Sequence, residues 1–264
     1  MNRSVSDSND LPESDWAMGV DDPGPLRGQV WLTLQTVQAR RLVRGRSGSA
    51  GKPPIFGLTT FADRLRVIWQ AARDDDPYAD WWLIKIHQAL ESKEKRLRSI
   101  RQMLDERLAQ MDAIDVSVAT SERPFRTPLR FANPYAYRAA HLLANYDAQV
   151  CAALTAHHVG VLAHRTCVDL IRQGSHEIRG LFSLPLSYRF LRIDRAEVER
   201  GSPKARDAER RMGSLPDEVL SGEHRAPLAP QRRRRPSGFS DHIQLHPASP
   251  SSEGRSSPAE NDDA

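Results

Sequence analysis

Two short segments of the sequence bring together residue types that could bind a ligand or a metal. The first runs from Gly45 to Lys52 and is similar to a phosphate-binding loop. Five residues separate Gly45 from Gly51 where that loop has four, and Pro53 stands in place of the Ser or Thr that binds magnesium. Proline also removes a backbone donor from a loop built of backbone donors. These departures argue against nucleotide binding.

The second segment holds two cysteines and three histidines, namely Cys151, His157, His158, His164 and Cys167. A metal site needs three or four converging ligands, and none of the five belongs to a C-x-x-C or H-x-x-x-H pair. Buried cysteines usually belong to a core, and histidines at a helix end usually meet the negative end of its dipole. We therefore expect no metal and no cofactor.

Motifs of common enzyme classes are also missing from the sequence. It contains no G-x-S-x-G, H-E-x-x-H or G-x-G-x-x-G pattern. The carboxylates of Asp74, Asp75 and Asp76 precede a predicted helix, where they suit the positive end of its dipole. The protein is therefore predicted not to be an enzyme, and no small-molecule substrate is expected.

Positive charge is concentrated near the start of the sequence, although the formal net charge of the whole is only +4. Between residues 27 and 52 there is no acidic residue, and the basic ones are Arg27, Arg40, Arg41, Arg44, Arg46 and Lys52. A segment of one charge sign favours a polyanionic partner. The alternative is a solvated basic loop.

Residues 29–37 alternate between apolar and polar types, which predicts a half-buried strand. Val30, Leu32 and Leu34 share one face; the opposite face carries Gln29, Trp31, Thr33 and Gln35. Glutamine and threonine can bond base edges, so Gln29, Thr33 and Gln35 are predicted to read DNA. The neighbouring arginines are predicted to hold phosphates: Arg27, Arg40, Arg41, Arg44 and Arg46. An ordinary surface strand with a basic flank is the alternative.

A strand followed by two helices is the minimal pattern of a ribbon-helix-helix protein, in which two chains pair strands into a ribbon that enters the major groove. A loop is predicted over 45–57 and a helix from Thr59 or Thr60 to about Arg73. The separation of the helices from the strand by about ten residues fits that pattern poorly.

Asp76-Pro77 predicts the start of a long helix that reaches about Met111. Its leucines recur every seven residues and form a predicted dimerisation seam: Leu83, Leu90, Leu97 and Leu104. Lys93 and Arg107 interrupt the companion positions of the seam. Packing of this face within one chain is therefore the alternative to a homodimer.

The second half of the sequence is predicted to be mainly helical. Pro124 and Pro128 favour extended chain over 114–131, and Asn133-Pro134 predicts a helix that ends near His158. The further expected helices span about 165–173, 175–183 and 203–212, with Asp194 as a helix cap.

These elements give an α+β fold that is mostly α-helical, with an N-terminal strand followed by helices. The expected domain spans 27–222, divided into a DNA-binding and dimerisation part at 27–111 and a strand and helical remainder at 112–222. An acidic arm (1–26) and a tail rich in Pro, Ser and Arg (223–264) are predicted to be disordered, because neither has apolar residues enough to offset its ordering entropy.

Three stretches of the sequence resemble an integrating conjugative element protein family that includes AcaB-like plasmid regulators. They are 75–83 (DDPYADWWL), 130–138 (RFANPYAYR) and 188–191 (YRFL), and the likeness covers about 30–215. The resemblance implies transcriptional activation by a DNA-binding dimer with a ribbon-helix-helix-like region, in the context of conjugative transfer. It carries no DNA-contacting residue over to this sequence.

Residues and resemblance together predict a sequence-specific transcriptional regulator whose partners are double-stranded DNA and a second copy of itself. The sequence has no 18-residue apolar run and no basic-then-apolar leader, so no membrane partner is expected and the cytoplasm is the expected compartment. The main alternative is a non-enzymatic assembly or maintenance factor of the conjugative element, acting through the heptad seam. A helical domain that binds a small molecule is a third possibility.

Overall fold

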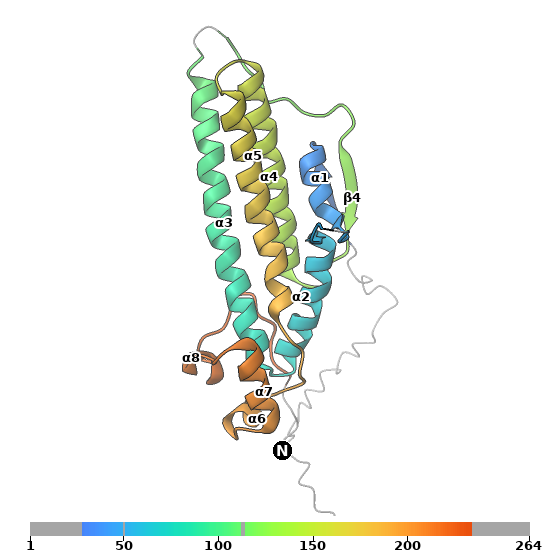
Figure 1. The fold of residues 1–264 in the computed structure, drawn as a ribbon, viewed down its shortest axis with the longest axis vertical. Coiled ribbons are helices and arrows are strands. Elements are labelled where there is room, and N and C mark those ends of the chain that lie inside the picture. Colours follow the sequence, from blue (N-terminus) through green and yellow to red (C-terminus); the bar gives the residue numbers. More distant parts are fainter. Residues whose placement is uncertain (1–27, 50, 112–113, 234–264) are drawn as a thin grey trace, which may run out of the picture. The chain divides into compact units, whose positions relative to one another are not determined.

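Three long helices form the centre of the structure (Figure 1). The computed structural model describes residues 28–49, 51–111 and 114–233. The central helices are α3 (Pro77–Ala109), α4 (Pro134–His158) and α5 (His164–Ser183). Arg138 of α4 pairs with Glu94 of α3, and further along the same two helices Arg101 donates to the carbonyl of Ala148. The contacts advance in the same direction on both helices, so α3 and α4 run parallel.

Helix α5 runs antiparallel to both. Glu177, near its C-terminal end, accepts from Lys93 of α3 at 2.7 Å and also contacts Arg96. These two cations outweigh the burial of the carboxylate and hold the pKa of Glu177 below its usual value. At the other end of α5, Cys167 packs with Leu104 and Ala156.

The N-terminal ends of α3 and α4 confirm the predicted helix starts. The carboxylate of Asp76 accepts from the backbone N–H of Tyr78 and Ala79, and the Asn133 side chain accepts from Ala136 N–H. Proline occupies the first position of each helix, where its missing N–H is harmless. The predicted ends near 111 and 158 agree with the observed ends at Ala109 and His158.

The prediction of two separate helices at 165–173 and 175–183 is wrong, because α5 is continuous. Gly174 lies inside it and is buried. A Cβ atom there would lie 2.6 Å from the ring of Tyr146 and 3.2 Å from the Gln149 amide. The glycine is therefore a site of close packing between α4 and α5, which a local sequence pattern cannot distinguish from a helix break.

The N-terminal part pairs a strand with a distant strand of the same chain. Strand β1 (Val30–Leu34) lies antiparallel to β4 (Phe125–Leu129), with Leu32 opposite Thr127. Leu32 and Leu34 are buried, whereas Trp31 and Thr33 are exposed, as the alternation predicted. Val30 was predicted to share the inward face but is 45% exposed. The strand is shorter than the predicted range 29–37.

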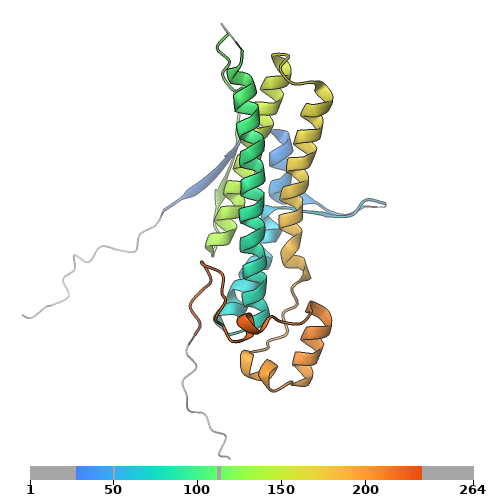
Figure 2. The same ribbon diagram turned by 90° about the vertical axis from the view of Figure 1, so that its left-hand side faces the viewer.

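A helix that was not predicted follows β1 directly. This helix, α1 (Val37–Arg44), is capped by the Thr36 side chain, which accepts from Ala39 N–H. The predicted loop at 45–57 contains a small hairpin of β2 (Gly45–Arg46) and β3 (Ile55–Phe56), which extends away from the helices in Figure 2. Helix α2 (Leu58–Arg73) then completes this part, close to its predicted range.

Short elements follow α5. They are the 3-10 turn η1 (Leu184–Ser187) and the helices α6 (Arg195–Glu199), α7 (Pro203–Met212) and α8 (Asp217–Leu220). Asp194 caps α6 in a reciprocal capping box with Glu197, as its position before the helix predicted. The unit that holds these elements extends to Arg232, so the expected boundary at 222 falls inside packed chain. The predicted acidic arm and most of the predicted tail lie outside the described residues.

The core collects apolar side chains from β1, α1, α2 and the three long helices. Phe61 and Phe182 meet in it with ring centroids 5.5 Å apart. Among the helices of the described ranges, none combines the length and the apolar character that crossing a bilayer requires. The fold is thus mostly helical with two small antiparallel sheets, as the predicted α+β class requires.

Candidate nucleic-acid interface

The outward face of the β1–β4 sheet combines aromatic and cationic side chains. Trp31 lies opposite Pro128 and Thr33 opposite Arg126, so these four residues share one face. Trp31 is 46% exposed, and the Arg126 guanidinium carbon lies 5.3 Å from its ring centroid. This geometry leaves the tryptophan accessible and places a cation over it.

Helix α1 carries the exposed arginines next to this sheet. Arg40, Arg41 and Arg44 are exposed, and the Arg40 guanidinium carbon lies 5.6 Å from the Phe125 ring of β4. Phe125 lies opposite the buried Leu34, so Arg40 meets the edge of the core-facing side of the sheet. No acidic side chain stands in the first turn of α1. In the described part of the chain, none of these arginines forms an ion pair. Their charge is therefore available to an outside anion.

A buried carboxylate fixes the junction between β1 and α1. Asp147 of α4 is 3% exposed and accepts from the backbone N–H of Gln35 at 2.6 Å and of Thr36 at 2.9 Å. The Thr36 hydroxyl donates to the same carboxylate at 2.6 Å. Three hydrogen bonds to one buried charge orient α1 relative to the sheet. The backbone of α1, which carries the exposed arginines, is therefore held in a fixed orientation.

Two glycines allow the hairpin base to lie against the end of α1. Gly45 has φ of 74°, and a Cβ atom there would lie 2.0 Å from the Ile55 carbonyl oxygen. A Cβ at Gly57 would lie 2.4 Å from Arg44 and Gly45 backbone atoms. Only glycine permits both the left-handed conformation and this approach. Arg46 is held beside the junction, because its guanidinium donates to the Pro53 carbonyl at 3.0 Å.

Of the three residues predicted to read bases, two are exposed and one is half-buried. Gln29 and Thr33 are exposed, one just before β1 and the other within it. Gln35 lies beyond the end of the strand and is half-buried, and its side-chain oxygen accepts from Ser121 N–H at 3.0 Å. Gln35 therefore stabilises the fold through this hydrogen bond. It is not on the outward face, because the strand and its alternation end at Leu34.

The predicted phosphate contacts are brought together only in part. Arg40 and Arg44 lie on α1 beside the sheet, and Arg41 and Arg46 line a neighbouring cavity. Arg27 lies outside the described residues. Arg126 was missed because β4 lies far from β1 in the sequence and no local pattern assigns the two strands to one sheet.

The four leucines of the predicted dimerisation seam are buried within one chain. Leu83, Leu90 and Leu104 are 0% exposed and Leu97 is 2% exposed. They face the helices that pack against α3, which supports the alternative of intramolecular packing. The heptad repeat thus describes the buried side of α3.

The histidines and cysteines singled out in the sequence do not converge. Cys151 and Cys167 are buried, and burial raises the pKa of both thiols. The rings of His157 and His164 have centroids 5.2 Å apart. No group of three or more His, Cys, Asp or Glu in the described ranges is arranged to hold a metal ion.

A family model described as "Transcriptional regulator AcaB" matches residues 22–233. This chain belongs to the AcaB family of transcriptional regulators. A solved structure, the crystal structure of selenomethionine-containing AcaB from uropathogenic E. coli, is similar with a TM-score of 0.53 and 15% identity, covering 74% of this chain and 95% of that one. At that identity the likeness concerns the fold. No curated protein matches the chain.

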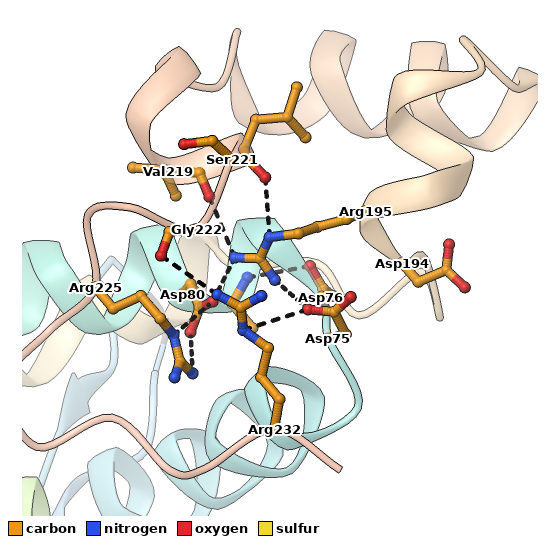
Figure 3. Close-up of polar contacts among 12 residues, drawn as sticks. Asp75, Asp76, Asp80, Asp194, Arg195, Val219, Ser221, Gly222, Arg225 and Arg232 are labelled. Atoms are coloured by element: carbon orange, nitrogen blue, oxygen red, sulfur yellow. Dashed lines mark hydrogen bonds and ion pairs between the residues drawn. The ribbon is translucent and has the colours of Figure 1, made fainter. Parts of the chain in front are cut away.

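Two aspartates of the first stretch that resembles the AcaB family belong to an ionic cluster with three arginines from further along the chain (Figure 3). Asp80 of α3 is 0% exposed and accepts from Arg195 of α6 at 2.6 Å and from Arg225 at 2.9 Å. Asp75 contacts Arg195 as well, and Arg232 lies 3.5 Å from the same carboxylate. Three cations thereby bind the C-terminal segment to the start of α3.

Two tyrosines add hydrogen bonds near this ionic cluster. Tyr188 donates its hydroxyl to Asp76 at 2.7 Å, and burial raises the pKa of both groups, that of Asp76 to about 6. Tyr135, from the second stretch, accepts from Leu228 N–H at 3.1 Å. Residues of the three stretches therefore hold the fold together, and they lie apart from the arginines of α1.

Proposed function

We propose that this chain is a DNA-binding transcriptional regulator that acts on conjugative transfer genes of a mobile element. The observation that carries the proposal is the pair of exposed arginines on α1, Arg40 and Arg44, which form no ion pair within the described ranges. Helix α1 lies beside the β1–β4 sheet, whose outward face carries Trp31, Thr33 and Arg126. Membership of the AcaB family supports a regulatory role. The arginines supply phosphate contacts that set affinity.

Base recognition is assigned to Gln29 and Thr33, whose side chains remain exposed. A glutamine can bond adenine in two places, and a threonine can contact a base edge or a thymine methyl group. Trp31 and Arg126 on the same face add a stacking surface and a further cation.

A homodimer is proposed through the second edge of β1. Only one edge of β1 is paired, because its sheet consists of β1 and β4 in the described part of the chain. Antiparallel pairing of two such edges would create a ribbon with two copies of the outward face. The order of β1, α1 and α2 resembles that of a ribbon-helix-helix region, with the β2–β3 hairpin inserted between the two helices and with α1 closer to the strand than the sequence indicated.

The test is a binding titration of the full chain against upstream regions of its own element, with random duplex as competitor, at two salt concentrations. We expect one region to be preferred and affinity to fall steeply as salt rises. The double variant Arg40→Ala/Arg44→Ala should weaken all sequences alike and reduce the salt slope by about two, because each arginine that is removed neutralises about one phosphate.

Arg107→Ala is the matched control, because Arg107 is an exposed arginine of α3 that lies away from α1 in the sequence. An equal loss of affinity in that variant would show that only overall charge matters. Weak binding that ignores sequence in the wild type would contradict the proposal and favour an assembly factor of the conjugative element.

A further inference from the structure

A cavity of about 530 Å³ lies between α1, the β2–β3 hairpin, α4 and α5. Four arginines from three elements line it: Arg41, Arg46, Arg172 and Arg179. Among the described residues that line the cavity, none carries a carboxylate. Apolar side chains, among them Leu42, Ile55 and Ile171, form the rest of the wall.

Most N–H donors of these four guanidinium groups have no partner among the hydrogen bonds and ion pairs of the described residues. In the part of the chain that the structure describes, none of the four forms an ion pair. Arg46 donates to the Pro53 carbonyl, and Arg179 donates through Nε to the Ser175 carbonyl, which leaves their other donors open. Arginine stays charged in proteins, so an anion that enters the cavity meets four positive groups.

The chemistry of the lining selects the ligand. A planar guanidinium fork matches phosphate oxygens in a bidentate manner, and several forks suit more than one negative charge. The volume falls within the range of about 300–1,000 Å³ that is typical of sites for small molecules. The apolar wall offers contact to an organic body in addition to the charged groups.

We propose that this cavity binds a small phosphorylated organic anion with at least two negative charges. The site is distinct from the proposed DNA surface on α1. Gln38, Arg41 and Leu42 turn one side of α1 to the cavity, whereas Arg40 and Arg44 are not among its lining residues. Binding of the anion therefore does not require DNA.

The experiment is isothermal titration calorimetry of the full chain without DNA, using inorganic pyrophosphate and adenosine diphosphate at constant ionic strength. We expect saturable binding of both, with the nucleotide at least as tight because its organic body contacts the apolar wall. The double variant Arg172→Gln/Arg179→Gln should weaken binding at least tenfold. Thermal unfolding without ligand checks that the variant is folded.

Arg165→Gln is the matched control, since Arg165 is exposed on the same helix two turns before Arg172 and does not line the cavity. Its affinity for both probes should equal that of the wild type. The variant Arg172→Lys/Arg179→Lys keeps the charges but removes the forks, and we expect an intermediate loss of affinity. If the glutamine variant unfolds, the affinity of this lysine variant tests the proposal in its place.

Two results would overturn the proposal. One is the absence of saturable binding of either probe; the other is an equal loss of affinity in Arg165→Gln, which would reduce the effect to general charge. Failure of the DNA proposal is distinguishable, because Arg40→Ala/Arg44→Ala should change DNA affinity and leave pyrophosphate binding intact. If Arg172→Gln/Arg179→Gln instead lowers DNA affinity as much as probe affinity, the cavity is a DNA phosphate contact and the small-anion assignment is wrong.

Discussion

Thr33, which we propose to contact a base, is an exposed residue on a strand whose position is well defined. Its backbone is paired with Arg126 of β4, so its side chain leaves the strand from a fixed point on the outward face. The neighbours Leu32 and Leu34 are buried in the core. A base contact made from such a strand therefore needs little ordering of the protein on binding.

Replacing Thr33 by valine keeps the branched side chain and the strand preference but removes the hydroxyl. We expect Thr33→Val to weaken binding of the preferred DNA by about 1–3 kcal/mol and to leave random duplex unaffected. Competition titrations at one salt concentration measure both. A parallel loss on both DNAs would contradict base reading by Thr33.

Asp76 gives a pH-dependent contribution to stability. Burial raises its pKa from 3.8 to about 6 in the folded chain. The folded state thus binds the proton more tightly than the unfolded state, so the contribution of Asp76 to stability rises as pH falls through about 6 and levels off below the unfolded value. It is lost as pH rises again.

The variant Asp76→Asn keeps a capping oxygen for α3 but cannot titrate. Between pH 7 and pH 5 we expect wild-type stability to increase relative to this variant by roughly 1 kcal/mol. Urea unfolding of both proteins at the two pH values measures the difference and cancels the other carboxylates, such as Glu177. A constant difference would show that Asp76 is ionised throughout.

At the scale of elements, the close contact between α4 and α5 depends on Gly174, which has no side chain. Gly174→Ala improves helix propensity but places a Cβ atom 2.6 Å from the Tyr146 ring, and that tyrosine is fully buried. We expect a net loss of about 1–3 kcal/mol in the free energy of unfolding, because overpacking outweighs propensity. Chemical denaturation measures it.

Gly180 is the matched control on the same helix. A Cβ atom there would meet only the Lys93 ammonium group, at 3.7 Å. Gly180→Ala should therefore raise the free energy of unfolding by up to about 1 kcal/mol. If both alanine variants were stabilising, the close approach of α5 to α4 at Gly174 would be wrong.

At the scale of the whole molecule, the ionic cluster joins segments that are far apart in the sequence. Arg225 donates to Asp80 across 145 positions. In Arg225→Ala the buried Asp80 carboxylate would keep Arg195 but lose its second cation, so the free energy of unfolding should fall by about 2–3 kcal/mol. Thermal and urea unfolding should agree on the decrease.

Arg211→Ala tests whether removal of any arginine has this effect. Arg211 pairs with Asp207 one turn away on α7, and its side chain is 56% exposed. We expect a change below about 0.5 kcal/mol for this surface pair. A similar change in Arg225→Ala would mean that the C-terminal segment contributes little to the fold.

Much of the local structure could be predicted from particular residues. Asp76-Pro77 and Asn133-Pro134 mark helix starts because capping involves only residues within one turn. The alternation at 30–34 fixed which side of β1 faces the core. Helix α1 was not predicted because the strand was extended to residue 37, across Thr36, whose side chain caps this helix.

The sequence by itself determined the helical class, the main helix ends and the accumulation of positive charge between residues 27 and 52. Only the tertiary structure decided that β1 pairs with β4, that the leucines of α3 face inward, and that Arg172 and Arg179 share a cavity with Arg41. The physical reason is range. Caps and periodicity act within a few residues, whereas strand pairing and cavity lining depend on packing between segments whose separation along the chain carries no local signal.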